Sequence, residues 1–218
     1  MLTYSKPEID HRTIKLIVGG IAFLLPFLTN LLTPSILSIS ASYFEGGWSQ
    51  SIFIGSLFAI SAFLLAYNGD SRTQMILSKI AACAAFCIAM FPCECLDERR
   101  SLMAKCAKDV IDIQGVHGFS AAVMFGILAF FCYVFFDHAR AKGHREARWR
   151  SIVYAICGLA ILAAMLTLTV NYFHNLGIAR LTFYGEATGL MAFAVSWLTA
   201  SQVLPVITAK PERFNPFD

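Results

Sequence analysis

Long apolar runs alternate with short polar connections along the whole chain. Six of these runs come close to the ~20 residues that an α-helix needs to cross ~30 Å of hydrocarbon. Each run contains few charged residues, and polar stretches with Gly, Pro, Asn or Asp separate one run from the next. The pattern predicts six transmembrane helices, over residues 14–32, 51–67, 75–91, 116–136, 151–173 and 181–204.

The predicted fold is therefore all-α, a polytopic membrane protein built as a bundle of six transmembrane helices. Residues 1–13 are polar, and no small-residue cleavage site follows the first apolar run, so we interpret them as a retained N-terminal tail. Pro205 ends the last run, and a short Pro-containing tail follows it. The predicted domains are an N-terminal tail (1–13), a transmembrane domain (14–205) and a C-terminal tail (206–218).

Composition agrees with a protein that lies in a bilayer. Hydrophobic residues make up 57% of the chain and charged residues 14%, against roughly 25% charged residues in soluble domains. The mean hydropathy is +0.64. The formal net charge of +3 is too small to indicate binding to nucleic acid.

Positively charged residues are distributed unevenly between the two sides that this topology defines. With the N-terminus inside, twelve of the 17 Lys and Arg residues fall on the cytoplasmic side, five of them in 138–150, the most basic connection. The other side holds Arg99, Arg100, Lys105, Lys108 and Arg180. Cytoplasmic loops of membrane proteins carry an excess of Lys and Arg, so we expect both termini in the cytoplasm and the loop 92–115 outside it.

Polar residues near the outer ends of the predicted helices are the candidate site. Glu186 lies roughly 8 Å below the membrane surface, at 1.5 Å per helical residue, and an ionisable residue at such a depth suggests a function and needs a partner. We name His117, in the first turn of the fourth span, as that partner. With His174, Asn171 and Glu94, the two would line an outer-leaflet polar pocket for a lipid headgroup. The alternatives are a polar pair that only pins two helices together, and a catalytic or metal-binding role.

Three cysteines gather at the predicted outer loop. Cys93 and Cys95 are too close in sequence to favour a bond with each other, so a disulfide would join Cys106 to either of them in an oxidising compartment. A soft-metal site for copper or zinc and plain reduced thiols are the alternatives. The C-x-x-C spacing of thiol oxidoreductases is absent from the sequence.

The sequence favours a role without catalysis. It contains no HExxH, no G-x-S-x-G and no phosphate-cradling glycine loop. In the basic connection, Arg145, Arg148 and Arg150 flank Trp149 and could contact the phosphates of anionic lipids. The alternative for these arginines is that they only set the topology.

Several segments resemble successive blocks of an uncharacterised family of bacterial six-span membrane proteins. The blocks are PSILSISASYFEGGWSQSIFIG, AYNGDSRTQMILSKIAACAAFCIAMFPCE, GVHGFSAAVMFG, WRSIVYAICG and YGEATGLMAFAVSWLTAS. The family is similar in layout to the DRAM/Frag/Sfk superfamily of eukaryotic membrane proteins. The positions that carry the resemblance are Pro34, Ser40, Ser42, Phe91, Pro92, His117, Ala121, Ala122, Glu186 and Trp197. Cys93-x-Cys95 departs from the Phe-Pro-Thr ending expected after the third span.

The resemblance implies a membrane role linked to lipids, because the eukaryotic relatives are associated with lipid-anchor remodelling, phospholipid asymmetry and autophagy. It also implies the bacterial inner (plasma) membrane as the location. We therefore expect a protein that binds or organises membrane lipids, without a cofactor, as a homo-oligomer or part of a larger membrane complex. The alternatives are a lipid-modifying enzyme that uses His117 and Glu186, a metal-, thiol- or transport-related protein that uses the three cysteines, and a structural subunit.

Overall fold

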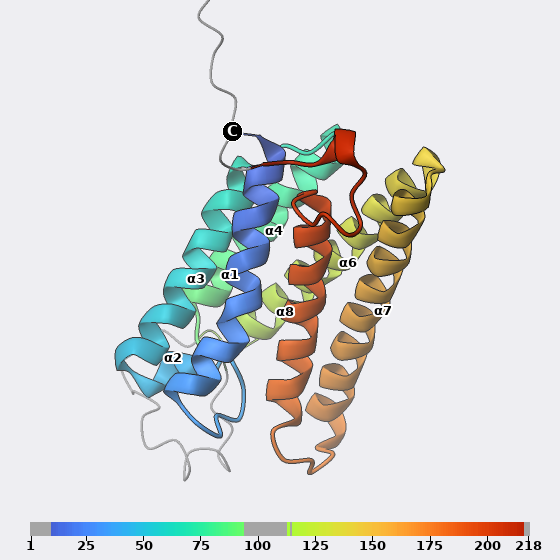
Figure 1. Ribbon diagram of the computed structural model, residues 1–218. Coiled ribbons are helices and arrows are strands. Elements are labelled where there is room, and N and C mark those ends of the chain that lie inside the picture. The colour runs from blue at the N-terminus through green and yellow to red at the C-terminus, as the bar shows by residue number, and fades with distance from the viewer. Residues whose placement is uncertain (1–9, 94–112, 114, 216–218) are drawn as a thin grey trace, which may run out of the picture.

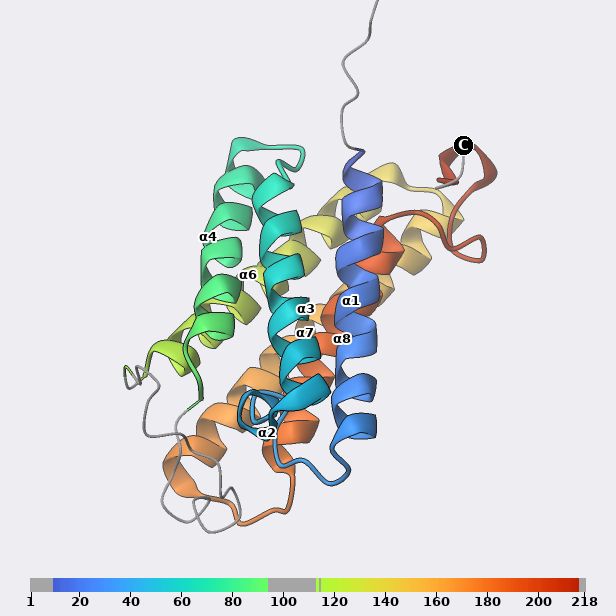
Figure 2. The same ribbon diagram turned by 90° about the vertical axis from the view of Figure 1, so that its left-hand side faces the viewer.

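The computed structural model describes residues 10–93, 113 and 115–215 of the chain. This part of the chain contains seven α-helices and no β-strand, which confirms the all-α class. The helices are α1 (His11–Leu32), α2 (Ser42–Glu45), α3 (Gly47–Ala66), α4 (Arg72–Met90), α6 (Val116–Lys142), α7 (Arg145–His174) and α8 (Leu181–Ala200), followed by the 3₁₀ helix η1 (Lys210–Glu212). The long helices lie side by side with alternating directions (Figure 1), and α6 crosses the bundle obliquely (Figure 2).

Five of the helices are long and apolar enough to cross a membrane, namely α1, α3, α4, α6 and α7. Helix α8 matches the sixth predicted span in position, but Glu186 and several Gly, Ser and Thr residues make it less apolar. It packs along α1 and α7 (Figure 1), and 11 of its 20 residues are buried. A helix that is more than half buried against other helices needs less apolar surface than a lipid-facing helix, which agrees with its composition.

Close packing fixes the position of α8. Gly185 faces Leu168 of α7, and a Cβ atom at this glycine would lie 2.6 Å from Leu168 Cδ2. Gly189 faces Phe125 of α6 in the same way, at 2.9 Å from its Cε1. Small residues let transmembrane helices approach closely, so these two glycines set α8 against both neighbours.

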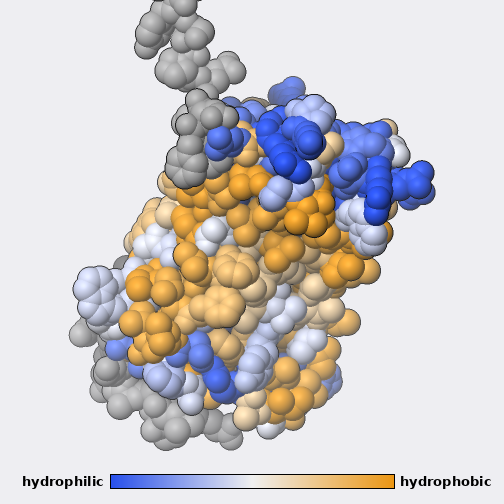
Figure 3. Space-filling view, viewed as in Figure 1, coloured by the Kyte–Doolittle hydropathy of each residue, from blue (hydrophilic) through white to orange (hydrophobic). Residues whose placement is uncertain are grey.

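The outward faces of the helices are apolar. Figure 3 shows a broad hydrophobic band over the face in view, with hydrophilic residues above it. Large apolar side chains that point outward include Leu24, Phe27, Leu31, Phe119, Tyr133, Ile156, Leu159 and Leu166. Soluble monomers rarely expose a continuous apolar surface of this extent. The structure is therefore that of an integral membrane protein.

The connection predicted over 138–150 is mostly helical. Helix α6 continues to Lys142 and α7 begins at Arg145, so only Gly143 and His144 separate them. Ala, Arg, Lys and Glu in this stretch are strong helix formers. Gly143 ends α6 with a φ of 74°, and the side chain of His144 accepts a hydrogen bond from Ala147 N to start α7. The polarity of the stretch indicated that it lies at one end of the bundle. It did not indicate its secondary structure.

The bundle has two ends with different charge. We call the end that holds the α7–α8 connection the Glu186 end, and the end that holds the α6–α7 connection and η1 the Glu212 end. The beginning of α1 and the segment around η1 both lie at the Glu212 end (Figure 1). Among the described residues, Arg180 is the one Lys or Arg at the Glu186 end. The loop cations Arg99, Arg100, Lys105 and Lys108 lie outside the described residues.

Candidate functional site

Glu186 binds the connection between α1 and α2. Its carboxylate accepts hydrogen bonds from the backbone N–H of Ile39, from that of Ser40 at 3.3 Å and from Ser40 Oγ at 2.7 Å. Ile39 and Ser40 are both buried. Hydrogen bonds to an ionised group are stronger than those between neutral groups. The carboxylate thus holds a buried, irregular segment against the first turns of α8.

Arg180 holds the same segment from the other side of the α8 N-terminus. Its Nε donates to Ile36 O at 3.0 Å, and one terminal nitrogen donates to Asn30 Oδ1 at 2.6 Å. The guanidinium also lies over the ring of Phe183, 4.4 Å from the ring centroid. Phe183 N donates to Leu37 O at 3.1 Å. Backbone groups of Ile36, Leu37, Ile39 and Ser40 are therefore paired with side-chain or backbone atoms of α8 or of Arg180, which precedes it.

His117 connects the start of α6 to the end of α4. Its Nδ1 lies 2.9 Å from Phe91 O, which places an N–H on Nδ1 in the bonded tautomer. In the contacts that the structure describes, His117 binds Phe91, whereas Glu186 binds Ile39 and Ser40. The direct pairing of these two side chains stays a prediction.

The other residues of the predicted outer pocket are distributed along the Glu186 end. Asn171 Oδ1 accepts from Leu176 N at 3.3 Å and so closes the end of α7, while His174 is the exposed last residue of that helix. Cys93 is half-buried just after α4. Glu94, Cys95 and Cys106 lie outside the described residues, so the disulfide and the cysteine-based metal site stay predictions. Within the described ranges, no three His, Cys, Asp or Glu side chains form a metal-binding group.

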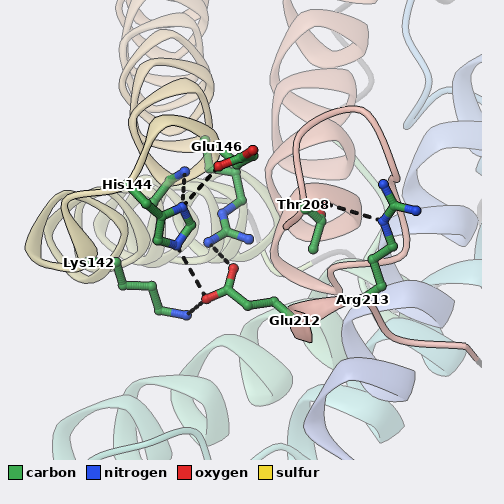
Figure 4. Close-up of polar contacts among 8 residues, drawn as sticks. Lys142, His144, Glu146, Thr208, Glu212 and Arg213 are labelled. Carbon is green, nitrogen blue, oxygen red and sulfur yellow. Dashed lines mark hydrogen bonds and ion pairs between the residues drawn. The ribbon is translucent and has the colours of Figure 1, made fainter. Parts of the chain in front are cut away.

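A cluster of ion pairs lies at the Glu212 end (Figure 4). The carboxylate of Glu212, in η1, accepts from Lys142 Nζ at 2.6 Å and from a terminal nitrogen of Arg150 at 2.7 Å. His144 Nε2 lies 3.6 Å from the same carboxylate. Arg213 donates to Thr208 O at 3.3 Å and holds the preceding turn. These contacts attach the segment after α8 to the α6–α7 connection.

The electrostatics of this cluster favour the ionised form of Glu212. Partial burial by itself would raise the pKa of the carboxyl group. Hydrogen bonds from Lys142 and Arg150, together with the positive charges of these residues, outweigh that effect and lower the pKa to about 2. The Glu212 carboxylate is therefore ionised at physiological pH.

Only part of the predicted lipid-contact group is available to lipid. Arg145 and Arg148 are exposed. Trp149, which also lies in the first turns of α7, is exposed as well. Arg150 is 2% exposed and is paired with Glu212 inside the protein. Sequence reasoning could not separate Arg150 from its neighbours, because no local signal shows that η1 folds back onto it.

A surface groove lies between the end of α6 and the start of α7. Its volume is about 450 Å³, and its lining consists of Phe136, Arg140, Gly143, Arg148, Ser151 and Ile152. The groove thus combines two guanidinium groups with apolar side chains. The sequence indicated Arg148 as a candidate, but it indicated neither Arg140 nor the groove.

Lys15 is a buried lysine. From the sequence alone it counted only as one of the cations that set the membrane orientation. The residue is 9% exposed, and its Nζ lies 4.9 Å from the ring centroid of Phe135 and 5.5 Å from that of Tyr67. Trp197, fully buried, contacts Tyr67 at a centroid distance of 5.3 Å. Aromatic faces attract a desolvated cation, so this arrangement joins α1, α6 and α8. The signal in the sequence was a lysine inside an apolar run.

Comparisons of the chain with models of protein families, with curated proteins and with solved structures found no match. The resemblance to bacterial six-span proteins and to the DRAM/Frag/Sfk superfamily therefore stays a prediction. The interpretation of the site rests on its own geometry.

Proposed function

We propose that the protein is a six-span protein of the bacterial inner membrane that binds or organises membrane lipid without catalysis. In this topology both termini are cytoplasmic, and the loop 92–115 faces outside. The observation that carries the proposal is the continuous apolar exterior that ends, at the Glu212 end, in exposed arginines beside a groove. Apolar faces accommodate acyl chains, and arginines at the interface attract anionic headgroups.

The position of α8 supports six spans. It runs alongside α1 and α7, both of which are apolar enough to cross a membrane (Figure 1). A helix that packs against such neighbours lies at the same depth as they do. The gathering of cations at the Glu212 end supports the cytoplasmic location of that end.

Reporter fusions test the topology. A fluorescent protein fused after Asp218 is expected to fluoresce, because the proposed C-terminus is cytoplasmic. Alkaline phosphatase inserted after Lys105 is expected to be active, because that enzyme folds only outside the cytoplasm. Active phosphatase both after Lys105 and after Asp218 would instead indicate that α8 does not span the membrane and would overturn the six-span topology.

Native mass spectrometry of the protein released from mild detergent tests lipid binding. The expected spectrum shows a phospholipid adduct that survives detergent exchange, and its mass identifies the headgroup. A bare monomer would contradict the proposal and favour a structural role. A partner subunit or a metal ion in the same spectrum would favour the corresponding alternative.

The described contacts of Glu186 make the Glu212 end the better place to look for lipid. The Glu186 carboxylate accepts bonds from the α1–α2 connection, which is a structural use of the charge. The lipid adduct could instead weaken in Glu186→Gln while the melting temperature stays unchanged. That result would indicate that lipid binds in the outer-leaflet pocket with His117.

A further inference from the structure

We infer that the groove between the ends of α6 and α7 binds the phosphate of an anionic phospholipid from the leaflet at the Glu212 end. This inference rests on the proposed function and names the ligand and the site. Arg140 and Arg148 would bind the phosphate, and Phe136 and Ile152 would contact the start of an acyl chain.

The groove lies at the expected level of the membrane–water interface. The apolar run of the fourth predicted span ends at Phe136, and that of the fifth begins at Ser151. Both residues line the groove, while Arg140 and Arg148 line its more polar part. A phospholipid has the same order of groups, with its phosphate between a polar headgroup and apolar chains. The groove therefore matches a phospholipid in both polarity and depth.

The outer face of α7 continues the apolar side of the groove. Ile152 is 48% exposed, and Ile156 and Leu159, one and two turns further along the helix, are exposed as well. Spacings of three and four residues place side chains on the same helix face. An acyl chain that leaves the groove would therefore run along this face. A free phosphate ion would make no use of it.

The charges of the two groove arginines are not paired within the described part of the chain. Among the described residues, no Asp or Glu forms a salt bridge with Arg140 or Arg148. Glu212 is instead paired with Lys142 and Arg150. Glu212 therefore neutralises charge on Lys142 and Arg150, and the two arginines of the groove keep their positive charge. Guanidinium groups bind phosphate through paired N–H donors.

Local structure holds the arginines on the two sides of the groove. The tight turn at Gly143 requires its φ of 74°, which residues with a Cβ atom rarely adopt. The guanidinium of Arg140 lies 5.8 Å from the ring centroid of Phe136, so the side chain is packed along the groove. Ser151 Oγ donates to Arg148 O at 2.7 Å and fixes the first turns of α7. The cationic groups are therefore partly ordered before a ligand arrives.

The double variant Arg140→Gln/Arg148→Gln tests the site. The wild-type protein and its variants are placed in nanodiscs that contain phosphatidylglycerol and phosphatidylcholine in equal amounts, and the lipid retained after release into mild detergent is measured by native mass spectrometry. We expect the wild type to retain phosphatidylglycerol preferentially. The double variant should retain about tenfold less, because it loses charge-assisted hydrogen bonds to the phosphate.

Arg72→Gln is the matched control. Arg72 is exposed at the start of α4, at the same end of the bundle, and carries the same charge, but it does not line the groove. We expect this variant to retain lipid like the wild type. An equal loss in Arg72→Gln would show a general effect of charge and would overturn the site. Retention in the double variant at the wild-type level would also overturn it, while leaving the proposed lipid binding intact. A wild type without any adduct would instead contradict the proposed function itself.

A charge-preserving variant guards against a folding defect. Arg140→Lys/Arg148→Lys keeps both positive charges but lacks the planar pairs of donors. We expect intermediate retention of phosphatidylglycerol at an unchanged melting temperature. Retention in this variant equal to that of the glutamine variant, in proteins with wild-type melting temperatures, would confirm that the guanidinium geometry is required. Retention equal to the wild type would refute the paired-donor contact.

Discussion

Replacing Glu186 by alanine is expected to lower the free energy of unfolding by about 3 kcal/mol. The substitution leaves the backbone N–H groups of Ile39 and Ser40 without the carboxylate that accepts their hydrogen bonds. Both residues are buried, so water cannot easily replace the acceptor. Thermal melting in detergent, followed by circular dichroism, measures the effect.

Two other variants show whether the carboxylate is the cause. Ser40→Ala removes only the hydroxyl donor, which bonds Glu186 at 2.7 Å, and should cost about 1 kcal/mol. Thr188→Ala, at an exposed position on the same helix, should change stability by less than about 0.5 kcal/mol. A Glu186→Ala protein as stable as Thr188→Ala would show that the α1–α2 connection does not depend on this carboxylate.

Replacing Glu212 by alanine is expected to cost about 3 kcal/mol and to release the segment after α8. Arg150 is 2% exposed, and its guanidinium would lose the carboxylate that it contacts at 2.7 Å. A buried charge without its counter-ion is strongly destabilising. Faster tryptic cleavage at Arg213 and a lower melting temperature are the two readouts.

Lys142→Ala is the matched control for this cluster. It breaks the other ion pair of Glu212, but the Lys142 side chain is 43% exposed. Exposed ion pairs contribute less than about 1 kcal/mol, so the variant should stay close to the wild type in both readouts. Equal effects of the two substitutions would contradict the primary role of the Arg150 pair.

The pH dependence of stability provides a second readout of Glu212. Its pKa in the folded protein is lowered from 4.5 to about 2, so its contribution to stability is present in full above about pH 4.5. As the pH falls from 4.5 towards 2, protonation removes that contribution. We therefore expect the difference in melting temperature between the wild type and Glu212→Gln to shrink over this interval. A difference that is constant with pH would contradict the ionised pair.

The helices themselves were largely predictable. Apolar runs identified α3, α4, α6 and α7 because the requirement to cross a fixed apolar thickness acts on each segment separately. The error over 138–150 came from equating polarity with a loop. Arg145 and Ala147 favour a helix whether or not their surroundings are apolar, and only the turn at Gly143 interrupts it.

The candidate site was predictable in its residue types but not in its contacts. Glu186 was identified because a carboxylate within an apolar run needs partners. Its described partners include Ser40, 146 residues away, and the sequence pattern does not encode which loop meets which helix. The same applies to the groove. Arg140 and Arg148 line it only because of the angle at which α6 and α7 leave the short turn between them.

By itself, the sequence determined the class of the protein, the position of its apolar helices and the uneven distribution of cations between their ends. These are local properties, since hydropathy and helix propensity act over a few turns. The tertiary structure alone decided that Glu186 holds the α1–α2 connection, that Arg150 is buried against Glu212 62 residues away, and that Arg140 and Arg148 face an open groove. Such pairings depend on the order in which helices pack, and that order is set by contacts between segments far apart in the chain.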